Sequence, residues 1–149
     1  MIKKYIVLTS LIFFLTNCGF SPIYIKNTNT NFSIKNVNYQ GDRELNNFLK
    51  TNLNQYKDEN SDRKILIEAT SEYEKITLTK NAASEVTNYK LVANVTFLIK
   101  STNKKINITE EKIISSLDDK FEEARKERAT KQNFARSISN KLISELIIN

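Results

Sequence analysis

The sequence predicts an α+β fold: a two-layer sandwich in which two helices pack on one face of a four-stranded, mostly antiparallel sheet. Apolar residues recur at helical spacing over residues 43–56 and again over residues 134–146. Between these two regions, three segments alternate apolar and polar residues, as strands do. A short strand-like segment comes first, so the predicted order is β-α-β-β-β-α. Helices in such an order collect on one face of the sheet.

The first strand and the first helix have separate signals. Residues 32–39 alternate in the manner of a strand, with a break in phase near Asn36. Gly41 ends this segment, and Asp42 is of the residue type that caps a helix. We therefore expect a helix from about Arg43 to Tyr56.

Three strands in series should form the middle of the chain. Alternation is clear over residues 65–69, and the apolar phase switches between Tyr73 and Ile76, which predicts a β-bulge there. Residues 89–99 place six apolar side chains on one face, and residues 106–114 form the returning strand. Short connections between the three predict an antiparallel meander.

The last part of the chain should be helical. Residues 118–131 alternate in charge, and they include Glu122 with Lys126 and Glu127 with Lys131 at i,i+4 spacing. Such pairs favour an exposed helix. The amphipathic segment that follows presents an apolar face to the sheet.

Composition excludes most enzymes and metal sites. Among 149 residues, Cys18 is the only cysteine and histidine is absent, so no disulfide, zinc site or Ser-His-acid triad can be built. Four glutamates, at positions 68, 72, 74 and 85, lack the ligand spacing of a calcium loop. We expect no catalytic residue, no metal and no cofactor, and hence a protein that is not an enzyme. A carboxylate-only glycosidase acting on peptidoglycan is the enzymatic alternative.

The N-terminal segment has the pattern of an export signal. Lys3 and Lys4 are followed by an apolar stretch over residues 5–15, which is too short to span a bilayer. The stretch leads into Leu15-Thr16-Asn17-Cys18-Gly19 and resembles a bacterial lipobox, although Gly, Ala or Ser is usual where Asn17 stands. Cys18 is therefore the predicted lipidation site, and a buried free cysteine ending an N-terminal helix is the alternative.

This interpretation divides the chain into three parts. Residues 1–17 form the signal peptide, residues 18–31 the lipidated cysteine with a linker, and residues 32–149 the folded domain. Gly19 follows the cysteine where Asp would favour inner-membrane retention, so we expect an outer-membrane protein held by its lipid anchor. The net charge of +6 favours anionic partners, and export removes nucleic acid from these.

Three segments resemble the LPS-assembly lipoprotein family LptE, in its alphaproteobacterial form. Residues 18–24 (CGFSPIY) are similar to the family's opening, residues 87–93 (TNYKLVA) to its entry into the third strand, and residues 132–138 (QNFARSI) to the start of its last helix. The similarity covers essentially the whole chain after the leader, in the same order of elements. Each motif is weak by itself; their combination with Cys18 is more specific.

The resemblance implies a non-enzymatic role. Members of the family plug the lumen of the LptD β-barrel, assist its assembly and help to deliver lipopolysaccharide to the outer leaflet, so this chain should face the periplasm and the barrel lumen. The family contacts the phosphorylated end of lipid A through basic residues. The matching positions here are Lys80 and Lys126, with Arg125 and Arg128 flanking the second. The alternative is that Lys80 is a solvated turn residue and the others an exposed helix face.

The same sequence is also compatible with a second function. An auxiliary lipoprotein of a lipid-transport ABC system would share the leader and a small α/β domain, but it would bind protein instead of saccharide. The two functions differ in the protein that should co-purify with the chain.

Overall fold

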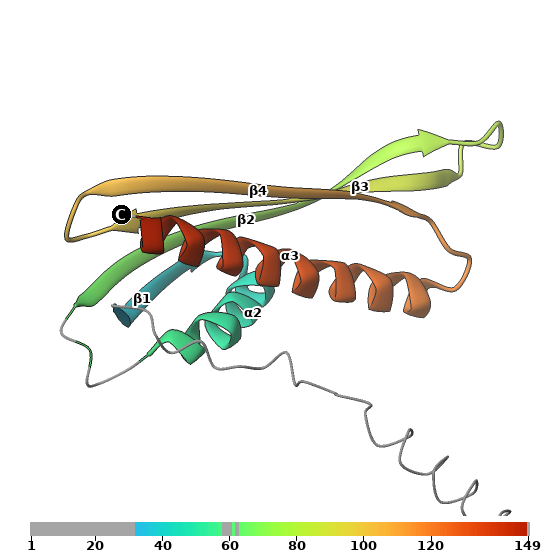
Figure 1. Ribbon diagram of the computed structural model, residues 1–149. Helices are drawn as coiled ribbons and strands as arrows, with labels where there is room; N and C mark the ends of the chain where they lie inside the picture. Colours follow the sequence, from blue (N-terminus) through green and yellow to red (C-terminus); the bar gives the residue numbers. More distant parts are fainter. Residues whose placement is uncertain (1–31, 58–60, 62, 149) are drawn as a thin grey trace, which may run out of the picture.

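A computed structural model describes residues 32–57, 61 and 63–148, and these form the predicted α+β sandwich (Figure 1). The elements in order are β1 (Ser33–Gly41), α2 (Arg43–Leu53), the 3₁₀ turn η2 (Asn54–Tyr56), β2 (Lys64–Lys80), β3 (Val86–Ile99), β4 (Lys104–Ser115) and α3 (Lys120–Ile148). The sheet order is β1-β2-β3-β4, with β1 parallel to β2 and the other neighbours antiparallel. The helices lie on one side of the sheet, which confirms the predicted fold.

The expectations for the leader, for Cys18 and for the linker concern residues 1–31, which lie outside the described residues. Within the described part of the chain, no helix combines the length and the apolar character needed to cross a membrane.

The start of the domain follows the sequence signals closely. The pairing of β1 with β2 shifts between Ile34 and Asn36, where the apolar phase breaks. Gly41 ends the strand at φ +95°, and a Cβ at this position would overlap the backbone carbonyl of Ser71, so only glycine fits. The side chain of Asp42 accepts a hydrogen bond from the backbone N–H of Leu45 at 2.7 Å, which caps α2 as predicted.

The core lies between the sheet and the two helices. On β3 it consists of every second residue, as alternation predicts: Leu91, Ala93, Val95, Phe97 and Ile99, all at most 3% exposed. On the helices it consists of Leu45, Leu49 and Leu53 of α2 and Phe134, Ala135, Ile138, Leu142, Ile143 and Leu146 of α3. The apolar contribution of α3 therefore begins at Phe134, well after the helix begins.

The bulge predicted in β2 is misplaced. Pairing with β3 runs without a shift from Ile67 to Thr77, and the irregularities fall between Thr77 and Lys80. The apolar phase switches earlier because Ile76 and Leu78, 42% and 45% exposed, do not continue the core face.

The charged segment and the amphipathic segment at the end of the chain form one helix, α3. The predicted i,i+4 pairs are not formed. Glu127 instead accepts hydrogen bonds from β2, and the ammonium of Lys131 lies 3.0 Å from a carboxylate oxygen of Glu44 in α2. For Glu127 and Lys131, contacts with other elements replace the pair along the helix, because this face of α3 is turned toward the sheet and α2. Glu122 pairs along the helix, but with Arg125 at i,i+3.

Candidate functional site

The turn of the β2–β3 hairpin and the beginning of α3 lie at the same end of the molecule (Figure 1). The predicted basic residues belong to these two segments: Lys80 ends β2, and Arg125, Lys126 and Arg128 lie in the first half of α3. Thr79 and Thr87 face each other across this hairpin, with their hydroxyl oxygens 2.6 Å apart. The backbone N–H of Ser116, just after β4, donates to the carbonyl of Thr87 at 2.8 Å. The chain therefore passes beside the hairpin before it enters α3.

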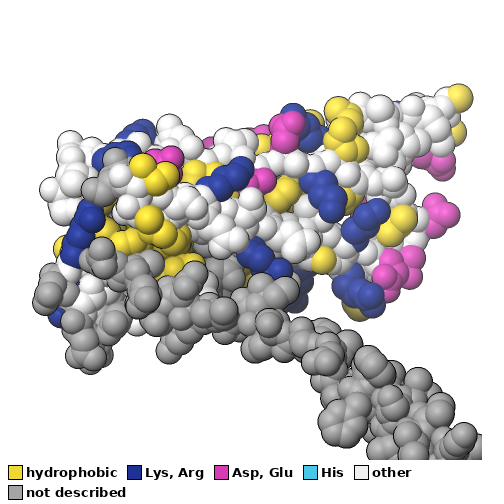
Figure 2. All heavy atoms as spheres, viewed as in Figure 1, with side chains coloured by type: hydrophobic (Ala, Val, Ile, Leu, Met, Phe, Trp, Pro, Cys, Tyr) yellow, Lys and Arg dark blue, Asp and Glu magenta, His cyan; other side chains and the backbone are white. Residues whose placement is uncertain are grey.

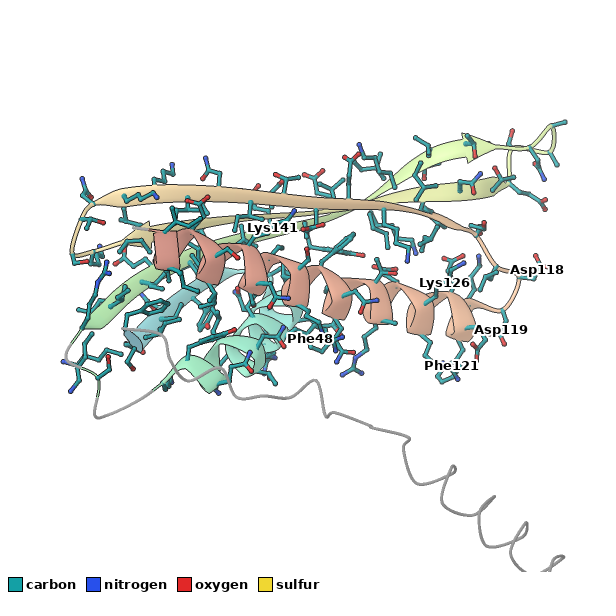
Figure 3. All side chains as sticks on the ribbon, in the orientation of Figure 1. Phe48, Asp118, Asp119, Phe121, Lys126 and Lys141 are labelled. Atoms are coloured by element: carbon teal, nitrogen blue, oxygen red, sulfur yellow. The ribbon has the colours of Figure 1, made fainter. Side chains whose placement is uncertain are left out.

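Two of the four predicted residues have charged side chains without a partner among the described residues. Lys80 is exposed at the last position of β2, and Lys126 is exposed on α3 (Figure 3). Among the described residues, neither side chain forms a hydrogen bond or an ion pair. Both ammonium groups are thus accessible to an anionic ligand.

The two arginines have partners in the chain. Arg125 lies 3.3 Å from the carboxylate of Glu122, and Arg128 lies 3.3 Å from that of Glu44. The guanidinium of Arg128 also lies over the ring of Phe48, 5.9 Å from its centre. Since both arginines are 70% exposed at the side chain, a ligand could still reach them.

The structure places Arg125, Lys126 and Arg128 on one helix, α3, and Lys80 on a separate element, at the end of β2. The local charge is also mixed. Figure 2 shows acidic side chains next to basic ones at the end of the molecule where α3 begins. An anion would therefore be held by individual side chains and not by a broad positive surface.

A buried carboxylate near these residues escaped sequence analysis. Glu123 is 4% exposed and accepts a hydrogen bond from the backbone N–H of Leu117 at 2.9 Å. It also accepts hydrogen bonds from Ser116 at 3.0 Å, Lys75 at 3.0 Å and Lys120 at 3.3 Å. The backbone hydrogen bond from Leu117 is the main cause that lowers the pKa of Glu123 to about 2, against the opposing effect of burial.

Lys75 of β2 connects two carboxylates of α3. Its ammonium lies 3.0 Å from Glu123 and 2.9 Å from Glu127, and it sits over the ring of Tyr89 at 4.2 Å from the centre. Burial opposes the charge on Lys75, but the hydrogen bonds to the two carboxylates outweigh it and raise the pKa of Lys75. The hydroxyl of Tyr73 donates to Glu127 at 3.1 Å, and burial together with Glu127 raises the pKa of Tyr73.

Lys131 extends this network to α2. It is 7% exposed, and its ammonium lies 3.0 Å from Glu44, 3.7 Å from Asp42 and 3.9 Å from the ring centre of Tyr73. The contacts are all with opposite charges or an aromatic face, so burial of this cation is compensated.

The network therefore fixes the first half of α3 against the sheet and α2, and it thereby positions Lys126. No group of three or more acidic, cysteine or histidine side chains that could hold a metal ion occurs in the described residues. The members of the network on α3, Glu123, Glu127 and Lys131, recur every four residues. Their partners come from β2 and α2, and spacing along the chain does not reveal that they meet.

The comparisons with known proteins identify the fold. Crystal structures of rare lipoprotein B from Shewanella oneidensis and of a minor lipoprotein from Acinetobacter baumannii match with TM-scores of 0.55 and 0.50. The first is 12% identical, covering 74% of this chain and 92% of the other; the second is 15% identical, covering 74% and 94%. A solution structure of an uncharacterized lipoprotein B from Nitrosomonas europaea matches at TM-score 0.54 and 13% identity, covering 78% and 85%.

No family model matches the chain, and no curated protein matches its sequence. The structural likeness extends over most of each neighbour, so the complete domain is shared and not a single motif. At this level of identity the likeness establishes a common fold.

Proposed function

We propose that this chain is an outer-membrane lipoprotein of the LptE type, which plugs the LptD β-barrel, assists its assembly and helps to deliver lipopolysaccharide. The observation that carries the proposal is the fold shared with three structures described as lipoproteins, over 85–94% of their chains. This chain combines that fold with an export-type leader that ends at a single cysteine, Cys18.

Two features of the domain support the same role. A wide barrel leaves a lumen that must be filled, and a small two-layer domain is suited to filling it. In addition, the ammonium groups of Lys80 and Lys126, which have no partner within the described part of the chain, are suited to phosphate or carboxylate groups of lipopolysaccharide. In this function the lipid on Cys18 holds the domain at the membrane while the barrel encloses it.

A mild-detergent pull-down of the tagged full chain from its envelope tests the proposal. A large β-barrel protein should co-purify, and with it lipopolysaccharide. The matched control is Cys18→Ala, which should leave an uncleaved precursor without lipid and lose most of the barrel. Recovery of an ABC transporter without any barrel would overturn the plug function. Lipid on the Cys18→Ala variant would overturn the assigned lipidation site.

A further inference from the structure

The two halves of α3 are held to the rest of the domain by different kinds of contact. From Phe134 onward the helix buries apolar side chains, among them Ile138, which is fully covered. Before Phe134 its apolar residues are exposed: Phe121 at 72%, together with Ala124 and Ala129. Burial of apolar surface is the main favourable force in folding, and here it acts mainly on the second half of the helix.

Charged and hydrogen-bonded contacts hold the first half. Glu123 and Glu127 both contact the ammonium of Lys75, at 3.0 Å and 2.9 Å, and the hydroxyl of Tyr73 donates to Glu127 at 3.1 Å. The remaining partners of Glu123 belong to residues 116–120, directly before it in the chain, and can move with it. Water replaces contacts of this kind when they open, so their net contribution to stability is modest.

The boundary between the two halves lies near Thr130. The hydroxyl of Thr130 donates to the carbonyl of Lys126 at 2.9 Å, a bond that slightly weakens and bends a helix. Just before this residue, Arg128 forms an exposed pair with Glu44 of α2, and exposed pairs contribute little. Lys131, directly after it, is 7% exposed and lies 3.0 Å from Glu44, so the second half of α3 is anchored from this residue onward.

The first turns of α3 extend beyond α2 toward the turn of the β2–β3 hairpin (Figure 1). A helix segment this short is marginal in water by itself, since isolated helices need about 12–15 residues. We propose that residues 120–130 form a lid, which unfolds locally as one unit and refolds while the second half of α3 stays packed.

Opening of the lid changes the charge that β2 presents. It removes Glu123 and Glu127 from Lys75, so the open state exposes this ammonium without the carboxylates that neutralise it when the lid is closed. The lid therefore controls access to a cation on the same strand as Lys80.

Amide hydrogen exchange of the purified full chain, in a series of urea concentrations below the unfolding transition, tests the lid. Under conditions where refolding is faster than exchange, amides of residues 124–130 should exchange faster than those of residues 138–146. Their exchange should depend little on urea, because local opening exposes little surface. Amides of residues 138–146 should exchange only when the whole domain unfolds, and they should accelerate steeply with urea.

Ile138→Val separates the two halves of the helix. The change removes one buried methylene, so exchange in residues 138–146 should become about fivefold faster. Exchange in residues 124–130 should stay unchanged, because Ile138 remains packed in the state in which only the lid is open.

Glu123→Gln tests what keeps the lid closed. Because the closed lid loses a charged contact with Lys75, exchange in residues 124–130 should become about thirtyfold faster. Glu122→Gln is the matched control on the same turn. It removes only an exposed pair with Arg125, so exchange should change by less than about twofold.

The proposal is overturned if residues 124–130 and 138–146 exchange at the same rate and with the same dependence on urea, since α3 would then open as a whole. It is also overturned if Ile138→Val accelerates both ranges equally, or if Glu123→Gln leaves residues 124–130 unchanged. The lid does not rest on the proposed function, because recovery of a β-barrel in the pull-down neither requires nor excludes its opening.

Discussion

The ammonium of Lys75 in β2 lies 3.0 Å from the buried carboxylate of Glu123 in α3, and this ion pair joins the helix to the sheet before its apolar face begins. The apolar contacts of α3 start at Phe134, so the earlier turns depend on charged and hydrogen-bonded contacts. The position of Lys126, three residues after Glu123, depends on the same contacts. Charged and hydrogen-bonded contacts therefore hold Lys126, a residue of the candidate ligand site, in its position.

Glu123→Gln should lower the free energy of unfolding by about 2 kcal/mol, because a hydrogen bond to a charged group contributes about 1.5–3 kcal/mol, and glutamine keeps one acceptor oxygen but loses the charge and the second acceptor. Glu122→Gln on the same turn is the matched control. Its carboxylate forms an exposed pair with Arg125, so the expected change is within about 0.5 kcal/mol. Urea denaturation of both variants measures the difference. Equal effects would show that Glu123 is not the anchor.

The same carboxylate predicts how stability depends on pH. The pKa of Glu123 falls from an ordinary 4.5 to about 2 in the folded chain, so its contribution is present above pH 4.5 and is lost as the pH falls toward 2. The pKa of Glu110 is also lowered, by hydrogen bonds from Lys141 and Ser137 that outweigh burial, and it acts in the same direction. Melting temperatures between pH 7 and pH 2 should decline less steeply for Glu123→Gln than for the natural chain. An unchanged slope would contradict this assignment.

The elements that the sequence predicts correctly are those with a local signal. Alternation defines β3, the Asp42 cap defines the start of α2, and a phase break marks the irregularity at Asn36. Ile76 misled the placement of the bulge, because a local pattern cannot distinguish a bulge from an apolar residue on the uncovered face.

Only part of the candidate site could be predicted from the sequence. Lys80 and Lys126 were found through the resemblance to a family, and the structure shows them exposed. The interpretation of Glu127 and Lys131 as an i,i+4 pair was wrong, since each finds a better partner on another element. Partners brought together by tertiary packing leave no periodic signal, so the network around Glu123 required the structure.

Val95→Asp should unfold the domain. Val95 is 1% exposed on the core face of β3, and an unpaired buried carboxylate costs several kcal/mol against a typical stability of about 5–15 kcal/mol. Thr96→Asp is the matched control on the opposite face, where the natural side chain donates a hydrogen bond to Asn107 at 2.9 Å. It should cost about 1 kcal/mol. Circular dichroism and thermal melting measure both, and equal losses would mean that β3 is covered on both faces.

Reversal of the free basic charges tests the lipopolysaccharide contact. Lys80→Glu and Lys126→Glu should each weaken binding of lipopolysaccharide to the purified chain without lowering its melting temperature, because neither ammonium has a partner among the described residues. The loss should shrink as salt rises, since exposed charges are screened over about 8 Å at physiological ionic strength. Lys57→Glu, an equal change in charge just after η2, is the control and should have little effect.

The three reversals together distinguish a site from a general attraction. An equal loss for all three variants would mean that binding follows net charge alone, and no site would remain at Lys80 and Lys126. No loss for any variant would mean that the basic residues do not contact the ligand, and the domain would then act in the barrel as a structural plug. A loss confined to Lys80→Glu and Lys126→Glu would mean that both side chains contribute to binding, which places the hairpin of β2 and β3 and the first half of α3 at the ligand. Because Glu123 positions that half of the helix, Glu123→Gln should then weaken binding as well, although it adds no negative charge.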